Sequence, residues 1–218
     1  MALIIIPAYN EAKKIGRVLR DLFEHGFKDV VVVDDGSGDV TGEIAASEGA
    51  VVLRHALNRG QGAALETGNE YARRQGFDTV VHFDADNQHD AGDIAPALEF
   101  LKVGNLDAVL GSRFMRANRL PVSKRLLILP LARLINFLFA GVKLTDGQNG
   151  FRIFGAAALQ KIRIEQPRMA HNSEIVGSLK RNNLKFAEVP VTVYYHEYGQ
   201  GMISGFRVVV DLVKSLFV

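Results

Sequence analysis

The sequence predicts an α/β protein whose mostly parallel central sheet carries helices on both faces. Short runs of aliphatic and β-branched residues alternate with amphipathic segments through the first half of the chain. Polar residues directly follow three of these runs, as ligand-binding residues do at the carboxyl ends of parallel strands. Alternation of this kind implies a parallel sheet that is covered on both sides. With 218 residues, 48% hydrophobic and 23% charged, the chain can bury such a core as one domain.

The elements expected up to residue 53 follow from apolar runs and helical spacing. The first strand covers 3–6, where the apolar run ends before a proline. A helix over 15–23 follows, because its apolar residues recur with a period of 3.6. We expect a second buried strand over 30–33, a short helix over about 40–48 and a third strand over 51–53.

The same alternation continues to residue 110. The glycine-containing loop 58–62 leads into a helix near 63–75. The strand expected next, 79–83, is the clearest, because four of its five residues are β-branched or aromatic. A helix near 94–103 and a strand over 108–110 complete this half.

The second half is less regular and is rich in amphipathic segments. Segment 123–144 is apolar with interspersed basic residues, and its uncharged runs fall short of the ~20 residues that span a bilayer. We expect an interfacial helix or a core helix there. The C-terminal 206–218 has apolar residues at helical spacing and would pack on its own domain, on a partner or on a membrane surface.

The acidic cluster 84–88, Asp-Ala-Asp-Asn-Gln, is the most informative motif because it ends the buried strand 79–83. Carboxylate and amide oxygens are the ligands that Mg²⁺ prefers, together with water and substrate phosphates. An ordinary turn is the alternative interpretation, since Asp and Asn are common turn residues. The strands at 3–6 and 30–33 also end in polar residues, so three polar sets are expected along one edge of the sheet.

Charge and cysteine usage narrow the function classes. The net charge is only +2, yet segment 108–145 holds seven Lys and Arg residues and no Asp or Glu. Such a concentrated basic segment points to a localised anionic partner. The absence of cysteine excludes a disulfide framework, a thiolate metal site and a Cys nucleophile. The N-terminus lacks a basic n-region and is not expected to be a signal peptide.

Six motifs in a fixed order carry a resemblance to a known family. They are IIIPAYNE at 4–11, VDDGS at 33–37, NRGQGA at 58–63, FDADNQH at 83–89, GSR at 111–113 and DGQNGFR at 146–152. The chain resembles glycosyltransferase family 2, in particular its polyprenyl-phosphate, dolichol-phosphate mannose synthase-like branch. The resemblance implies a single GT-A domain over 1–218, with a Rossmann-like nucleotide-sugar-binding half at 1–112 and an acceptor-binding half with amphipathic helices at 113–218.

The resemblance also implies a donor site that holds a UDP- or GDP-linked sugar together with Mg²⁺ or Mn²⁺. Asp34 or Asp35 would contact the base, and Asp84 would lie near the ribose and the metal. Asp86 and Gln88 would hold the metal against the diphosphate. The residues expected to bind the nucleotide sugar are Pro7, Tyr9, Glu11, Asp34, Asp35, Gly62, Asp84, Ala85 and Asp86.

An acceptor-phosphate cradle is expected from four basic residues: Arg113, Lys124, Arg125 and Arg152. Guanidinium groups bind phosphate oxygens in a bidentate way, although a solvated surface charge is the commoner fate of any single Arg. Basic groups beside apolar helices favour a lipid-phosphate headgroup. The catalytic residues implied are Asp86, Arg113 and Arg152.

The expected reaction is a single displacement with inversion at the anomeric carbon. A phosphate acceptor is already anionic and needs no general base, whereas a sugar hydroxyl does. Asp146 stands where hydroxyl-accepting relatives place a base, and its Gly-Gln-Asn neighbours depart from the Pro-x-Ser of the lipid-phosphate branch. The alternatives are a saccharide-hydroxyl acceptor in cell-surface polysaccharide synthesis and a non-catalytic nucleotide-sugar-binding subunit.

The expected location is the cytoplasmic side of the membrane, peripheral to its inner face, with polyprenyl phosphate and no nucleic acid as partner. Either the enzyme is peripheral, or a small membrane protein anchors it, or the native chain continues past Val218; these alternatives stay open. Among the remaining polar residues, His82 is expected to be a core histidine. Asn172 or Ser173 is expected to cap a helix that opens at His171.

Overall fold

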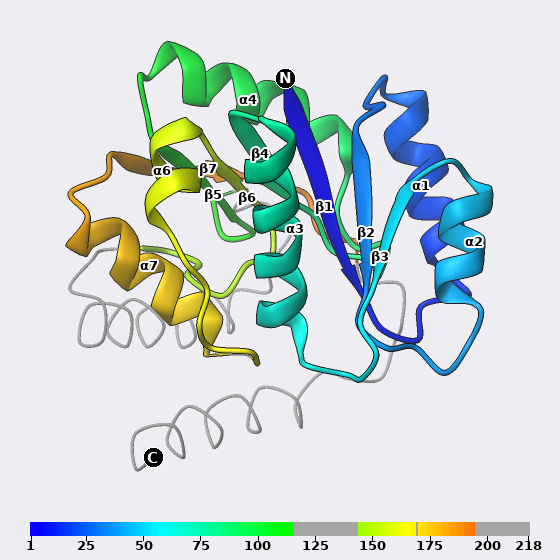
Figure 1. The fold of residues 1–218 in the computed structure, drawn as a ribbon. Coiled ribbons are helices and arrows are strands. Elements are labelled where there is room, and N and C mark those ends of the chain that lie inside the picture. Colours follow the sequence, from blue (N-terminus) through cyan, green and yellow to red (C-terminus); the bar gives the residue numbers. More distant parts are fainter. Residues whose placement is uncertain (116–143, 169, 195–218) are drawn as a thin grey trace, which may run out of the picture.

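The computed structural model describes residues 1–115, 144–168 and 170–194 (Figure 1). Its centre is a seven-stranded sheet with the order β3-β2-β1-β4-β6-β5-β7. The strands are β1 Ala2–Ala8, β2 Val30–Asp34, β3 Val51–Arg54, β4 Thr79–His82, β5 Ala108–Ser112, β6 Arg152–Phe154 and β7 Phe186–Pro190. All pairings are parallel except those of β6, which runs antiparallel to both β4 and β5.

Helices cover both faces of the sheet, as the alternating pattern predicts. They are α1 Ile15–Glu24, α2 Thr41–Ser47, α3 Gln61–Gln75, α4 Ile94–Val103 with the short 3₁₀ turn η1 Ala91–Asp93 before it, α6 Ala156–Lys161 and α7 His171–Arg181. Within β1, Ile4 and Ile6 pack with α1, α2 and α4, whereas Leu3 and Ile5 pack with α3, α6 and α7. The two-residue period of the strand therefore divides the core into two layers.

The nine elements predicted up to residue 110 are all present, with ends displaced by a few residues. The first strand is longer than expected, and α3 begins two residues earlier, at Gln61. β3 lies at the edge of the sheet, which explains why Val51 is exposed although the run reads as apolar.

The sequence did not reveal β6, α6 or β7, which are short or half-exposed. The expected cap of α7 is wrong: Ala170 occupies the N-cap position and no side chain bonds there. Asn172 is instead buried and bonds other side chains of the core. Segments 123–143 and 206–218, with Lys124 and Arg125, lie outside the described residues. Among the described residues, no helix combines the length and the apolar character that a membrane crossing requires.

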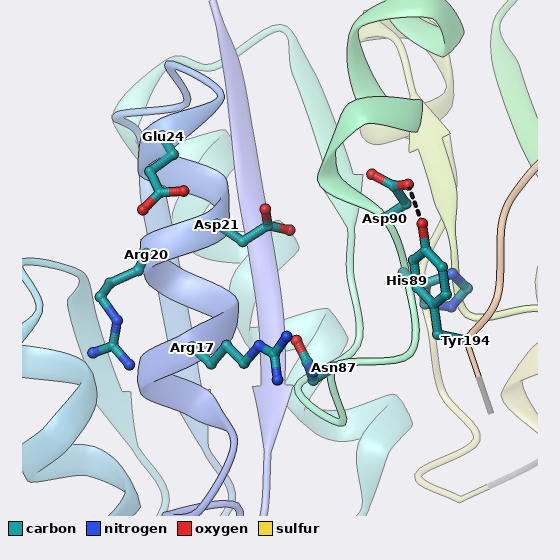
Figure 2. Close-up of a pocket in the computed structure, with 8 residues that line it drawn as sticks. All are labelled: Arg17, Arg20, Asp21, Glu24, Asn87, His89, Asp90 and Tyr194. Carbon is teal, nitrogen blue, oxygen red and sulfur yellow. Dashed lines mark hydrogen bonds between the residues drawn. The ribbon is translucent and has the colours of Figure 1, made fainter. Parts of the chain in front are cut away.

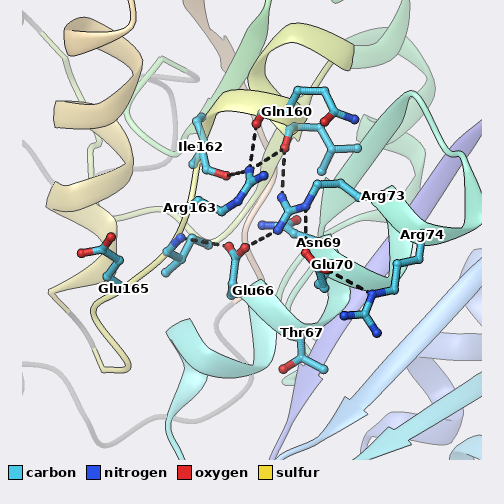
Figure 3. A network of polar contacts seen from close by, with 12 residues as sticks. Glu66, Thr67, Asn69, Glu70, Arg73, Arg74, Gln160, Ile162, Arg163 and Glu165 are labelled. Carbon is cyan, nitrogen blue, oxygen red and sulfur yellow. Dashed lines mark hydrogen bonds and ion pairs between the residues drawn. The ribbon is translucent and has the colours of Figure 1, made fainter.

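A polar network fastens α3 to the α6 region (Figure 3). Arg73 pairs with Glu66 and donates from Nη1 to the carbonyl of Leu159 at 2.9 Å. Glu66 in turn accepts from the backbone N–H of Ile164 at 2.9 Å. The Arg73 side chain is only 8% exposed, so this network is better shielded than a surface ion pair. It holds α3, whose first turn borders the site described next, against the second half of the chain.

Candidate active site

The carboxyl ends of β1, β2 and β4 enclose a cavity of about 380 Å³. Its lining comes from the loops after these strands and from the start of α3: Pro7, Ala8, Tyr9, Glu11, Asp35, Asn58, Gly60, Gln61, Ala64, Asp84, Ala85 and Asp86. The expected convergence of three polar sets at one edge of the sheet is therefore present. Of the residues expected to bind a nucleotide sugar, only Asp34 and Gly62 do not line the cavity.

The two neighbouring aspartates at the end of β2 have different surroundings. Asp34 is fully buried, accepts from the backbone N–H of Ser37 at 2.9 Å and lies 3.4 Å from Nε of Arg54. Asp35 faces the cavity and accepts from the backbone N–H groups of Arg59 at 2.9 Å and Gly60 at 2.7 Å. The structure therefore places Asp35, and not Asp34, where a bound molecule would touch it.

A histidine that the sequence did not single out supports Asp35. Nδ1 of His55 lies 2.7 Å from Oδ1 of Asp35, and its Nε2 lies 2.9 Å from the hydroxyl of Thr67. Thr67 belongs to α3 and His55 follows β3, so Asp35 is connected through His55 to both elements. A single His in a loop carries no sequence signal for this role.

The glycines of the loop 58–62 serve chain packing. Gly60 has φ 96°, which favours glycine, and a Cβ there would collide with the carbonyl of Pro167. A Cβ at Gly62 would collide with the carbonyl of Gln166, and its N–H donates to Pro167 O at 2.8 Å. The close approach of the 166–167 segment therefore accounts for both glycines.

Asp84 lies at the end of β4 and is held by two side chains. Oδ1 accepts from Nε2 of Gln61 at 3.0 Å, and Oδ2 lies 3.3 Å from Nε2 of His89. Burial opposes its charge, but the hydrogen bond and charge of His89 and the charge of Arg152 outweigh burial and lower the pKa of Asp84. A Cβ at Gly150 would collide with this carboxylate, so a backbone without a side chain closes the site on that side.

Asp86 and Glu11 are two further acids that line the cavity, and their charges act on each other. Burial raises the pKa of Asp86, and the charge of Asp84 raises it further. Burial likewise raises the pKa of Glu11, against the effect of Lys14, and Asp86 contributes in the same direction. Like charges that destabilise one another in this way would be stabilised by a cation. Within the three described ranges, no three His, Asp or Glu side chains are grouped so as to hold a metal ion alone.

Gln88 belongs to a loop that the last described residues hold in place. Its N–H donates to Oδ1 of Asp86 at 3.0 Å, and its carbonyl accepts from the N–H of Tyr194 at 2.8 Å. The Tyr194 hydroxyl donates to Asp90 at 2.9 Å (Figure 2), and His89 forms a β-bridge with Val193. Asn87, His89 and Asp90 of this loop line a second cavity, of about 490 Å³, whose other wall is formed by α1.

At the end of β5, Arg113 and Asp146 form a close ion pair. Nε of Arg113 donates at 2.7 Å and Nη2 at 2.9 Å, one to each oxygen of the carboxylate. Asp146 also accepts from the backbone N–H of Arg113 and from Nδ2 of Asn149. Glu188 of β7 accepts from the N–H of Asp146 at 2.9 Å and so fixes its backbone. The Asp146 side chain is only 1% exposed.

Comparison with known proteins decides the family. The family model for Glycosyl transferase family 2 matches residues 3–163. The chain belongs to glycosyltransferase family 2. It is a glycosyltransferase, and its sheet has the GT-A fold that the motifs predict.

Two relatives and one solved structure illustrate the match. The UDP-N-acetylglucosamine–dolichyl-phosphate N-acetylglucosaminyltransferase of Methanococcus voltae is 32% identical over 94% of this chain and 92% of its own. The undecaprenyl-phosphate mannosyltransferase of Micrococcus luteus is 31% identical over 93% and 87%. The glucosyl-3-phosphoglycerate synthase of Mycobacterium tuberculosis, solved with Mn²⁺, UDP-glucose and phosphoglyceric acid, has a TM-score of 0.69 and 19% identity over 91% of this chain and 72% of that one.

Arg152 of the glycosyltransferase is buried in the interior, whereas direct contact with an acceptor phosphate requires an accessible guanidinium. The residue is 2% exposed on β6, and its guanidinium donates to Oδ1 of Asn172. Burial lowers its pKa to about 10, although the charges of Asp84 and Asp146 oppose that shift. Arg152 therefore stands as a buried positive charge between the two aspartates.

Two further histidines of the glycosyltransferase, His82 and His171, are interior residues. His82 is buried, its Nε2 lies 2.9 Å from Oδ1 of Asn69, and its ring packs edge-on against Phe154, as expected of a core histidine. Burial lowers the pKa of His171 to about 4, and the charge of Arg152 adds to this effect. Asn58 and Gln61 also line the cavity, although the sequence did not indicate them. Both lie in the motif at 58–63, from which only Gly62 was expected to bind the nucleotide sugar.

Proposed function

We propose that this glycosyltransferase moves a sugar from a nucleoside-diphosphate sugar to a polyprenyl phosphate. A phosphate oxygen of the acceptor attacks the anomeric carbon while the bond to the diphosphate oxygen breaks. The nucleoside diphosphate leaves with the bonding electrons, and the anomeric configuration inverts. No covalent enzyme intermediate forms.

The main observation in support of this proposal is that the Asp146 carboxylate is buried and bonded to Arg113. Asp146 is the acid that would serve as general base toward a sugar hydroxyl, and a base must reach the proton that it removes. Both of its oxygens accept from Arg113, and its side chain is 1% exposed. A polyprenyl phosphate needs no proton removed, so it matches a site whose candidate base is engaged. The names of the two relatives described above also specify polyprenyl-type phosphate acceptors.

Asp86 and Gln88 would hold a divalent cation, Mg²⁺ or Mn²⁺, and Asp84 would lie beside it. The crowded acids of the cavity fit a cation, and Mg²⁺ typically uses one or two carboxylates and completes its shell with water and phosphate oxygens. When bound, the metal supplies Lewis-acid stabilisation of the charge on the departing diphosphate. The solved relative that contains Mn²⁺ with UDP-glucose is consistent with this assignment.

Donor and acceptor would approach from two sides of Asp84. Pro7, Tyr9, Glu11 and Asp35 would surround the nucleotide, whose base is uracil or guanine. Arg113, held in one orientation by Asp146, would bind the acceptor phosphate with Lys124 and Arg125. Arg152 would act through its neighbours, because a buried guanidinium between Asp84 and Asp146 stabilises both carboxylates. The lipid acceptor places the enzyme at a membrane surface.

The test supplies purified enzyme with Mn²⁺ and labelled UDP- or GDP-sugars in detergent, with undecaprenyl phosphate or dolichyl phosphate as acceptor. We expect a labelled lipid that releases its sugar in mild acid, with an anomeric configuration opposite to that of the donor. Transfer only to saccharides would overturn the proposal in favour of a hydroxyl acceptor. Donor binding without any transfer would indicate a non-catalytic subunit.

A further inference from the structure

We propose that the nucleotide-binding side of the molecule touches the lipid membrane directly, through a surface that we call the rim patch. The rim patch consists of Lys13, Val40, Leu57 and Arg59. It lies on the loops that follow β1, β2 and β3, beside the donor cavity. This inference rests on the proposed function, because a membrane-borne acceptor has to reach the same edge of the sheet.

The three loops lie near one another at the carboxyl edge of the sheet (Figure 1). Asn10 donates its N–H to Oγ of Ser37 at 3.0 Å and accepts from the N–H of Gly38 at 2.9 Å. A Cβ at Gly36 would lie 2.8 Å from backbone atoms of Leu57 and Asn58, so the second and third loops are in contact. The loops are therefore fixed relative to one another.

Two aliphatic side chains project from this surface into solvent. Leu57 is 77% exposed and Val40 is 57% exposed. A single exposed aliphatic residue is common on any protein. Here the two lie on adjoining loops beside a ligand cavity, and burial of such side chains in a membrane interface is favourable.

The charges around these side chains suit an anionic lipid surface. Lys13 and Arg59 are exposed, and within the described part of the chain their side chains have no acidic partner. The acids of the same loops are engaged: Glu11 by Lys14, and Asp39 by Thr41 and the backbone of Ala12. Free cations beside apolar groups bind anionic headgroups.

Membrane contact through the rim patch would turn the mouth of the donor cavity toward the lipid surface. The carboxyl end of β5, where Arg113 begins the acid-free basic segment, lies at the same edge of the sheet. Both sides of the active site would then meet the membrane together, and the acceptor phosphate would not have to leave the headgroup region.

Leu57 has a matched control at the opposite edge of the sheet. Val103 ends α4, the helix that precedes β5 in the chain, and is 76% exposed. The experiment compares wild type, Leu57→Asp, Val103→Asp and the double variant Lys13→Gln/Arg59→Gln. Each protein is floated with phosphatidylcholine vesicles that contain or lack phosphatidylglycerol. Transfer is measured with the acceptor embedded in these vesicles and with the acceptor dispersed in detergent.

We expect Leu57→Asp to lower vesicle binding about tenfold, and loss of the two cations to lower it by a similar factor only on phosphatidylglycerol vesicles. Transfer to the vesicle-embedded acceptor should fall in parallel, whereas transfer in detergent stays near wild type. Val103→Asp should match wild type in every assay.

Equal vesicle binding by Leu57→Asp and Val103→Asp would refute membrane contact through the rim patch. A wild-type protein that does not bind vesicles at all would refute it as well. These results leave transfer in detergent intact. Failure of the proposed function would instead abolish transfer in vesicles and in detergent alike, so the two failures can be told apart. Thermal unfolding of each variant identifies any loss that arises from misfolding.

Discussion

Arg113 bonds both carboxylate oxygens of Asp146, from Nε at 2.7 Å and from Nη2 at 2.9 Å. The pair joins the end of β5 to the loop before β6 and gives the guanidinium a single orientation. Under the proposed function, Asp146 would support acceptor binding by orienting Arg113, without taking a proton itself. The first prediction separates these two roles.

Replacement of Asp146 by Asn should weaken the enzyme by releasing Arg113. We expect the Michaelis constant for the lipid acceptor to rise and the free energy of unfolding to fall by about 2 kcal/mol, since the hydrogen bonds of Arg113 lose their charged acceptor. The shape of the pH–rate profile should be unchanged because Asp146 does not act as a base. Loss of the acidic limb of that profile in Asp146→Asn would show that it does.

Replacement of Asp86 by Ala should remove the metal requirement together with the activity. We expect kcat to fall at least about a hundredfold, because charge on the leaving diphosphate is no longer neutralised. Titration of Mn²⁺ into enzyme and nucleotide, followed by calorimetry, should show weakened binding. Asp39→Asn is the control, as Asp39 bonds Thr41 and does not line the cavity. Undiminished Mn²⁺-dependent turnover in Asp86→Ala would refute the metal assignment.

Replacement of Gly150 by Ala should displace Asp84, because the added Cβ collides with its carboxylate. We expect donor affinity to fall about tenfold and stability by about 1–3 kcal/mol, as in other overpacked sites. Gly38→Ala is the matched control, since the nearest atom to its Cβ lies 4.0 Å away. Wild-type donor affinity in Gly150→Ala would mean that Asp84 does not contact the donor complex.

Acid should destabilise the protein through His171. Its pKa is lowered to about 4 in the folded protein, from about 6.5 when unfolded, so folding favours the neutral ring. The stabilising effect is complete above pH 6.5 and is lost as the pH falls toward 4, to an extent of about 3 kcal/mol. Charges that face the ring come from Arg152 and Asp84.

Denaturant unfolding of wild type and His171→Gln between pH 7 and 4 measures this effect. The difference in stability between the two proteins should shrink as the pH falls. His25→Gln, which removes an exposed histidine, is the control and should keep the wild-type response to acid. A difference that stays constant with pH would contradict the assignment.

Much of the first half could be predicted because short apolar runs alternate regularly there with amphipathic helical segments. The apolar run at 30–33 correctly predicted a strand, and the helical spacing at 15–23 correctly predicted a helix, each close to its observed bounds. The motif at 33–37 predicted an aspartate in the cavity, but only the structure separates Asp35 from the buried Asp34. Local sequence cannot make this distinction, since it depends on the loop that donates from Arg59 and Gly60.

The second half shows the limit of the same approach. β6 has three residues, too few for a pattern, and its pairing with β4 and β5 encloses Arg152. The motif at 146–152 indicated that this arginine is a site residue. Its burial depends on the position of β6 between β4 and β5, which the local sequence does not encode. Likewise, the contact of Gly62 with Gln166 joins positions about a hundred residues apart.

The position of β6 also bears on how the chain folds during synthesis. β4 and β5 follow each other along the chain but do not pair; the strand between them is made some forty residues after β5. Until that strand emerges from the ribosome, both neighbours keep open backbone edges of the kind that invite wrong association. Residues 152–154 thus complete the sheet late in synthesis. We expect the ribosome-bound precursor to depend on chaperones until these residues are added.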